Sequence, residues 1–249
     1  MGKTFEALMK AEKESQKRLK EVAAFESKPF PKRLGRPEQT IPQQILEEYQ
    51  RLKYNLLHTH SGKGIKALLF TSPSEGEDHS PVLINFAMAL ASEGDKVLLV
   101  DANLRNPSFH HVFNLEKKSG LTDLLSGKSP LLNVVKETQT SHLSVITCGM
   151  APSNPSSAFE LNALDSYIQE MKAEYDWVLF DSPPINSSND SIALAPRVDG
   201  VVMVVQAEKT RWEVAEKAKQ RIEGGNGTIL GVILNNRRFH IPDRVYKAL

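Results

Sequence analysis

The feature that most constrains the fold of this chain is an alternation of short apolar runs with longer helical stretches after residue 45. The apolar runs are rich in Val, Leu and Ile, and they are Ala67–Phe70, Val97–Val100, Leu143–Ile146, Trp177–Phe180, Val201–Val205 and Ile229–Leu234. Helical stretches are predicted at 45–57, 82–93, 120–126, 157–173 and 211–223. Strands that are apolar on both faces and separated by helices indicate a buried parallel sheet. The sequence therefore predicts an α/β fold.

Three regions are predicted along the chain. Residues 1–26 read as an amphipathic N-terminal helix with a thin apolar stripe. Residues 27–44 form a linker that is rich in Pro and basic residues, because proline removes the backbone donors that a helix needs. Residues 45–249 form the α/β domain.

The composition limits the classes of partner. Of 249 residues, 40% are hydrophobic, so a sizeable core can form, and the net charge of +1 gives no bulk attraction to nucleic acid. We therefore expect no nucleic-acid partner. A single cysteine, Cys148, fits a reducing compartment. No apolar run approaches the roughly 18–20 residues of a membrane span, so we expect a soluble, cytoplasmic chain.

The loop 72–80 lies between a predicted strand and a predicted helix, where a phosphate-binding P-loop would lie. A working P-loop ends Gly-Lys-Ser/Thr, because glycine lets backbone amides approach the phosphates and lysine supplies a positive charge. Here those positions are Asp78, His79 and Ser80. Together with Gly76 and Glu77 they are the candidate phosphate-binding residues.

Two predicted strands end in aspartate, at Asp101 and Asp181. The carboxyl ends of parallel strands meet at one edge of a sheet, where ligands bind. A strand that ends in a carboxylate beside a phosphate loop is typical of a Walker B motif, which holds Mg²⁺. Ser80, Asp101 and Asp181 are therefore the candidate metal ligands. Ser80 followed by Pro81 has a second interpretation, as an ordinary helix N-cap and first helical residue.

From about Glu47 to Asn235 the chain resembles the bacterial tyrosine kinases of capsule and exopolysaccharide biosynthesis. The motifs that match in order are the loop 71–80, Asp101 with Leu104-Arg105, the segment from Gly120, Pro152-Ser-Asn-Pro155, Asp181-Ser-Pro-Pro184, Asp190, Lys209-Thr210 and Gly231-Val-Ile-Leu-Asn235. The resemblance implies a P-loop NTPase-type three-layer sandwich with a mostly parallel central sheet, preceded by the N-terminal helix and linker.

The resemblance also implies function. It implies ATP or ADP with Mg²⁺ as cofactors, and it adds Arg105 and Asn235 to the cofactor-binding candidates. In an active kinase Asp101 would be the catalytic base. A membrane protein of the polysaccharide chain-length-determinant (co-polymerase) type is the implied partner, which would place the chain at the inner face of the cell membrane. A homo-oligomer is the implied assembly.

The chain departs from the family at several positions. Asp78 and His79 replace the loop glycine and lysine, and Asn103 replaces an acid that would share the metal and the proton. The family's Glu-x-x-Arg-x-x-Arg assembly motif is here Glu47-x-x-Gln50-x-x-Lys53, and the C-terminal tyrosine cluster is reduced to Tyr246. Arginine offers a bidentate fork that lysine lacks, so the motif is weakened.

Three hypotheses follow. The first is a pseudokinase that acts as a scaffold or regulator of polysaccharide assembly. The second is an active tyrosine autokinase in which Lys63, Lys66, Arg105 or a neighbouring subunit replaces the missing lysine, since phosphoryl transfer depends mainly on positioning and charge. The third is a partitioning-type ATPase switch, which shares the fold and the Walker motifs.

Overall fold

The structure is a computed structural model that describes residues 43–59, 64–150, 152, 155, 159 and 163–236. The predicted helix 1–26, the linker as far as residue 42, Lys63 and Tyr246 lie outside the described residues. The helix predicted at 45–57 is observed as α2, Gln43–Thr59.

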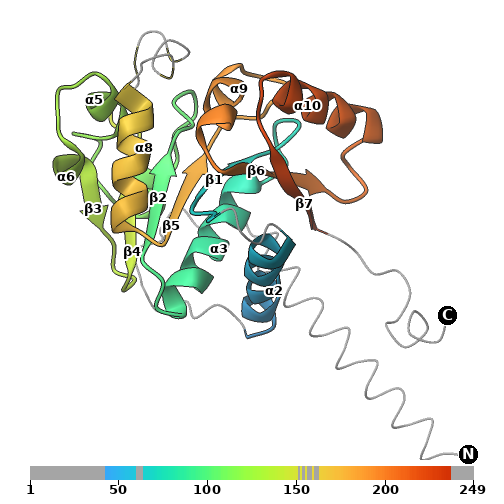
Figure 1. The fold of residues 1–249 in the computed structure, drawn as a ribbon, viewed down its shortest axis with the longest axis horizontal. Coiled ribbons are helices and arrows are strands. Elements are labelled where there is room, and N and C mark those ends of the chain that lie inside the picture. The colour runs from blue at the N-terminus through green and yellow to red at the C-terminus, as the bar shows by residue number, and fades with distance from the viewer. Residues whose placement is uncertain are drawn as a thin grey trace, which may run out of the picture.

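A mostly parallel sheet of seven strands forms the centre of the described chain (Figure 1). The strands are β1 Ala67–Thr71, β2 Val97–Asp101, β3 Val135–Glu137, β4 Leu143–Ile146, β5 Trp177–Asp181, β6 Gly200–Gln206 and β7 Ile229–Asn235. Their order is β3-β4-β2-β5-β1-β6-β7, and only β3 pairs antiparallel. All six predicted strands are confirmed, and β3 is an additional short strand at one edge.

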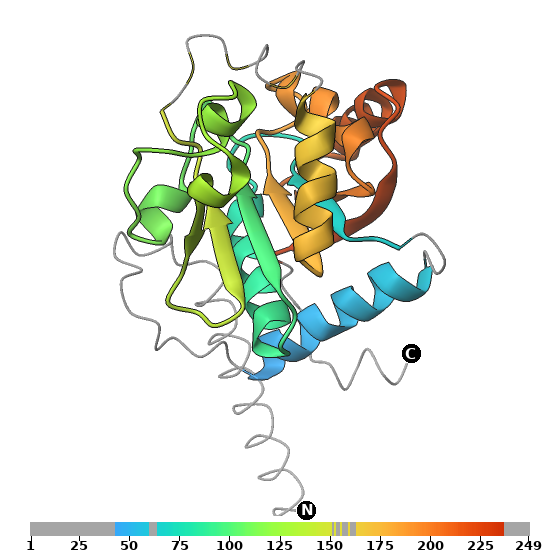
Figure 2. The same ribbon diagram turned by 60° about the vertical axis from the view of Figure 1, so that its left-hand side comes forward.

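Helices cover both faces of the sheet, so the predicted three-layer sandwich is confirmed (Figures 1 and 2). One face carries α2, α3 (His79–Ser92) and α4 (Phe109–Val112). The other carries α5 (Leu121–Leu125), α6 (Leu131–Val134), α8 (Ala163–Glu174), α9 (Asp190–Leu194), the 3₁₀ helix η1 (Ala195–Arg197) and α10 (Trp212–Gly224). Among the described helices, none is long and apolar enough to cross a membrane.

Helix α3 is the buried centre of its layer. Nine of its residues are buried, and the ring of Phe86 lies 5.9–6.2 Å from the rings of Phe70, Trp177 and Tyr49. Aromatic pairs at these distances add about 0.5–1.5 kcal/mol each beyond burial. Tyr49 comes from α2, so this cluster holds α2 against α3. The Lys53 ammonium adds ion pairs to Glu93 at 2.7 Å and Asp95 at 2.6 Å.

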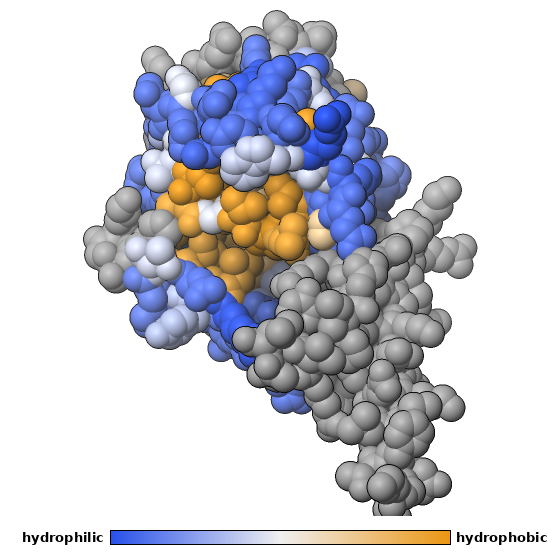
Figure 3. Space-filling model, turned by 90° about the vertical axis from the view of Figure 1, so that its right-hand side faces the viewer, coloured by the Kyte–Doolittle hydropathy of each residue, from blue (hydrophilic) through white to orange (hydrophobic). Residues whose placement is uncertain are grey.

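The edge strand β7 carries an exposed apolar surface. Val232 and Leu234 are 55% and 53% exposed, whereas their register neighbours on β6, Met203 and Val205, are buried and partly buried. Figure 3 views the molecule from this side. It shows a patch of apolar residues, with a hydrophilic surface at the top of the view.

The sheet brings four loops together at its carboxyl edge. Strands β2, β5, β1 and β6 are consecutive neighbours and run parallel, so the loops that follow them lie side by side. The register pairs Asp101 directly with Asp181. The two predicted metal-binding carboxylates are therefore adjacent because of the backbone, before any side-chain contact is considered.

Candidate active site

The loop between β1 and α3 has the course of a phosphate-binding loop with an unusual backbone. Gly76 and Asp78 both have positive φ angles, of 74° and 50°, and α3 begins at His79. Glycine adopts such a backbone freely, whereas aspartate does so at a cost. The N-cap is Asp78, so the interpretation of Ser80 as the N-cap is wrong: Ser80 is the second helical residue, and Pro81 follows it inside the first turn.

Ser80 instead bonds to the acidic residue at the end of β5. Its hydroxyl donates to both carboxylate oxygens of Asp181, at 2.9 and 2.8 Å. Asp181 is 1% exposed, and burial raises its pKa to about 7 even though the bond from Ser80 lowers it. A hydroxyl beside a carboxylate is the oxygen pair that a P-loop and a Walker B motif offer to Mg²⁺.

Asp101 anchors a short helix. Its Oδ2 accepts hydrogen bonds from the backbone amides of Ser108 and Phe109, both at 3.0 Å, at the start of α4. Its Oδ1 is buried without a hydrogen-bond partner. Burial, and then the neighbouring Asp181, raise the pKa of Asp101 to about 8. Oδ2 of Asp101 thus caps the start of α4, whereas Oδ1 is available to a proton or a ligand.

His79 turns into the protein, although it stands at the lysine position. The residue is 7% exposed, and its Nε2 lies 3.4 Å from Oδ1 of Asp181. Burial lowers the pKa of the ring to about 4, with a smaller opposing effect from a hydrogen bond to the Ser182 backbone. The ring is therefore neutral near pH 7, and the contact with Asp181 is not an ion pair.

Two residues after β6 tie down the loop. The Lys209 ammonium donates to the Gly76 carbonyl oxygen at 2.7 Å, and the Thr210 hydroxyl donates to Oε1 of Glu77 at 2.8 Å. Glu77 is 3% exposed and its Oε2 has no hydrogen-bond partner, and burial raises its pKa. Lys209 is thus a cation at the phosphate loop. It belongs to the Lys209-Thr210 motif, but the sequence does not indicate its contact with the loop.

The residues that follow β2 serve the local structure. Oδ1 of Asn103 accepts a hydrogen bond from the Asn106 amide at 3.1 Å. Arg105 binds the buried carboxylate of Asp190, with Nε at 2.9 Å from Oδ2, and also reaches the Ser188 hydroxyl at 3.1 Å. Arg105 therefore has a carboxylate partner, which competes with its predicted contact to a nucleotide phosphate.

The remaining candidates lie further from the centre of the site. Asn235 ends β7, is 7% exposed, and its carbonyl oxygen accepts from the Ala207 amide at 2.8 Å. Lys66 lies at the opposite end of β1, where its ammonium donates to carbonyl oxygens of Lys172 and Tyr175. Lys66 is therefore in the wrong place to replace the loop lysine.

The structure thus brings together His79, Ser80, Asp101 and Asp181, with Glu77 beside them. The Ser80 hydroxyl and the two carboxylates are hard oxygen ligands, and the unpartnered Oδ1 of Asp101 leaves one of them available, so these residues fit Mg²⁺. Within the described part of the chain, no three His, Cys, Asp or Glu side chains converge closely enough to hold a metal by themselves. Any ion here would need Ser80, water or phosphate to complete its shell.

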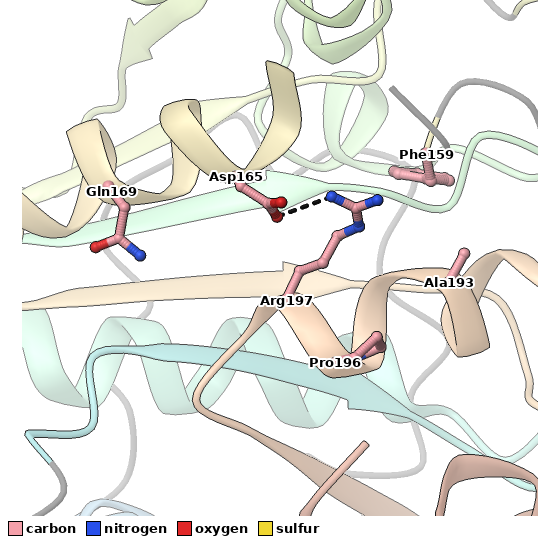
Figure 4. Close-up of a pocket in the computed structure, with 6 residues that line it drawn as sticks. All are labelled: Phe159, Asp165, Gln169, Ala193, Pro196 and Arg197. Carbon is pink, nitrogen blue, oxygen red and sulfur yellow. Dashed lines mark hydrogen bonds and ion pairs between the residues drawn. The ribbon is translucent and has the colours of Figure 1, made fainter. Parts of the chain in front are cut away.

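A separate pocket of about 510 Å³ lies between α8 and the α9–η1 segment (Figure 4). Asp165 and Arg197 pair across it at 2.8 Å, with Gln169 further along α8. None of the predicted site residues lines this pocket. Its two charged side chains, Arg197 and Asp165, bind each other.

The fold, with its site at the carboxyl edge of the sheet, places the protein in the class of α/β proteins with a P-loop nucleoside triphosphatase-type fold. A family model described as an AAA domain matches residues 76–223. The chain is 32% identical over 191 residues to the putative tyrosine-protein kinase CapB of Staphylococcus aureus, covering 77% of this chain and 84% of CapB. It is 35% identical over 192 residues to the tyrosine-protein kinase YwqD of Bacillus subtilis strain 168, covering 77% and 81%.

A solved structure agrees with these relatives. The kinase domain of the Escherichia coli tyrosine kinase ETK superposes with a TM-score of 0.75 at 25% identity, covering 85% of this chain and 88% of that domain. The chain therefore belongs to the AAA-domain family and, within it, to the bacterial tyrosine-protein kinases of capsule and exopolysaccharide biosynthesis.

Proposed function

We propose that this chain is a degenerate member of its family, a pseudokinase that acts by contact as a scaffold or regulator of the polysaccharide assembly machinery. The observation that carries the proposal is the state of His79: the residue at the lysine position is buried, neutral and turned toward Asp181. A charge-assisted hydrogen bond to phosphate contributes roughly 1.5–3 kcal/mol, and a neutral, buried ring does not supply it.

Two further features support weak nucleotide binding and weak phosphoryl transfer. Asp78 and Glu77 add acidic residues to the loop that would face phosphate, and like charges repel. The side-chain oxygen of Asn103 accepts a hydrogen bond from a backbone amide, and an amide side chain cannot act as a base.

A membrane protein of the chain-length-determinant type is the partner we propose, and contact with it would bring the chain to the membrane face.

A second candidate function is an active tyrosine autokinase, and one observation favours it. Lys209 brings an ammonium group to within 2.7 Å of a loop carbonyl. A rotation of this flexible side chain would bring its charge toward a bound phosphate, in the role that lysine has elsewhere. Lys209 is thus a better substitute than Lys66 or Arg105, since both of those are engaged at other sites.

Titration of Mg-ATP and Mg-ADP into the purified chain, with an assay for phosphotyrosine, tests both candidates. For a pseudokinase we expect no tyrosine phosphorylation, with or without a co-expressed membrane partner. Autophosphorylation that disappears in Asp181→Ala would overturn the pseudokinase proposal. If Lys209→Ala also abolished it, while Lys219→Ala on α10 did not, the second candidate would be supported.

A further inference from the structure

His79 is held so that one ring nitrogen faces a carboxylate with nothing between them. Its side chain is 9% exposed, its Nε2 has no hydrogen-bond partner, and that nitrogen lies 3.4 Å from Oδ1 of Asp181. The Ser182 backbone hydrogen-bonds the ring, and since Nε2 has no partner this bond falls to Nδ1. A ring that donates from Nδ1 carries its lone pair on Nε2. A lone pair facing a carboxylate oxygen is stabilised when a positive centre, either a proton or a metal ion, lies between them.

The separation of these two atoms matches two ligands of one metal ion. Zinc binds imidazole nitrogen at about 2.0–2.1 Å and carboxylate oxygen at about 2.0–2.2 Å, which places two tetrahedral ligands about 3.4 Å apart. Adjacent ligands of an octahedral Mg²⁺ at about 2.0–2.1 Å would be about 3.0 Å apart. The observed 3.4 Å between Nε2 and Oδ1 therefore fits the tetrahedral ion better.

The surroundings of both ligands are also those of a metal site. Histidine ligands usually donate their other N–H to a backbone carbonyl or a carboxylate, which fixes the ring and directs the lone pair. The bond between the His79 ring and the Ser182 backbone has this form. Ligating carboxylates are usually hydrogen-bonded in turn, and Asp181 accepts from the Ser80 hydroxyl at 2.8 and 2.9 Å.

A further oxygen lies on the neighbouring strand. Asp101 is the register partner of Asp181, and its Oδ1 is buried without a hydrogen-bond partner. It does not converge with the other two side chains into a closed three-residue site within the described residues. The first two ligands therefore define the site, and a bound ion would need water to complete its coordination.

We propose that Nε2 of His79 and Oδ1 of Asp181 form a two-residue binding site for a divalent metal ion of the borderline class, of which Zn²⁺ is the type. Nitrogen ligands suit Zn²⁺, whereas Mg²⁺ prefers oxygen alone. The substitution at the lysine position would thus have changed which ion the site prefers. This proposal does not depend on whether the chain binds nucleotide or has any kinase activity.

The test uses the full chain, freed of affinity tag and of metal, without nucleotide. Zn²⁺ is titrated by calorimetry, and Co²⁺ is added separately because its visible absorption reports tetrahedral nitrogen and oxygen ligation. We expect a Zn²⁺ site that His79→Ala and Asp181→Asn each weaken by more than about tenfold, since even the loss of an outer-shell partner costs 10- to 100-fold. His79→Lys restores a residue suited to the loop, and we expect it to remain folded and lose the site.

The control is His58→Ala, because His58 is an exposed histidine on α2 that is distant in sequence from the site. It should bind Zn²⁺ as the unmodified chain does. Zn²⁺ binding that is equal in the unmodified chain and in a folded His79→Lys variant would overturn the proposal, because the ion would then lie elsewhere. No binding of Zn²⁺ by the unmodified chain at millimolar concentration would also overturn it.

Discussion

Asp101 and Asp181 are direct register partners on adjacent parallel strands, and both carboxylates are buried. Arg105, the arginine nearest to Asp101 in the sequence, is engaged with Asp190. Burial raises the pKa of both carboxyls, to about 8 for Asp101 and about 7 for Asp181, and the neighbouring Asp181 adds to the rise at Asp101. The pH dependence of stability follows from this relationship.

The first prediction concerns Asp101→Asn. A carboxyl whose folded pKa is raised from 3.8 to about 8 contributes stability below pH 3.8 and loses it as the pH rises toward 8. The free energy of unfolding of the unmodified chain, relative to Asp101→Asn, should therefore fall between pH 5 and pH 8 by more than about 1 kcal/mol, since one pKa unit is about 1.4 kcal/mol. Urea unfolding at both pH values measures it.

His79 has the opposite sign and is present in both proteins of this comparison. Its pKa is lowered from 6.5 to about 4, so its contribution is present above pH 6.5 and is lost as the pH falls toward 4. Taking the difference between the two proteins removes most of this effect. A difference that stays constant from pH 5 to pH 8 would contradict the raised pKa of Asp101.

The second prediction concerns Ser80→Ala. The Ser80 hydroxyl is the group that lowers the pKa of Asp181 against burial, so its loss should raise that pKa further. The unfolding free energy should drop by about 1–3 kcal/mol at pH 8, where Asp181 is ionised, and by less at pH 5. Ser126→Ala is the control, because the Ser126 hydroxyl makes one exposed bond to a backbone oxygen. An equal loss at both pH values would show that Asp181 does not use the hydroxyl.

The third prediction concerns the backbone at the end of the loop. Asp78 has a φ of 50° and makes no side-chain capping bond, so Asp78→Gly removes strain without removing a contact. We expect it to stabilise the chain by roughly 0.5–1 kcal/mol in thermal unfolding. Asp78→Ala should not, because alanine meets the same strain.

The double change Asp78→Gly with His79→Lys should also raise Mg-ATP affinity, and unchanged affinity would mean that more than the loop has altered.

The fourth prediction concerns the tie between Thr210 and Glu77. Glu77 is buried, and the Thr210 hydroxyl is its hydrogen-bond donor at 2.8 Å. Thr210→Val should destabilise the chain by about 1–3 kcal/mol, because a buried carboxylate loses its side-chain donor. Part of this loss is the bond between the Gln206 amide and the Thr210 hydroxyl.

A double-mutant cycle with Glu77→Ala separates the two parts. We expect a coupling of at least about 0.5 kcal/mol between positions 77 and 210, measured by urea unfolding. Additive effects would mean that Thr210 acts only on its own strand end.

The sheet could be predicted closely from the sequence because its strands are buried on both faces. Runs such as Trp177–Phe180 have a burial pattern that leaves little choice of structure. Strand β3 was missed because Val135–Glu137 is short, partly exposed and polar, so no apolar run marks it. Helix α4 was missed for another reason: four residues carry no periodicity, and the acceptor for its first amides is Asp101, on a neighbouring strand.

The closeness of the loop residues to the two strand-end aspartates could be predicted, whereas the contacts that each residue makes could not. Asp101 and Asp181 were identifiable because each ends a strand, and register does the rest. The partner of Arg105 could not be predicted, since Asp190 is far away in the sequence. The direction of the His79 ring was equally out of reach, because it depends on burial beneath the loop and on a bond to the Ser182 backbone.

The register between β2 and β5 fixes the positions of the two carboxylates independently of the residue at position 79. The positions of the two carboxylates are set by main-chain pairing, which a substitution in the loop leaves intact. The residue at position 79 sits on the first turn of a helix that is anchored by its apolar residues further along. A single codon change there can exchange one chemistry for another without refolding the domain. In such a scaffold, the residue at position 79 can change while both carboxylates keep their places at the sheet edge.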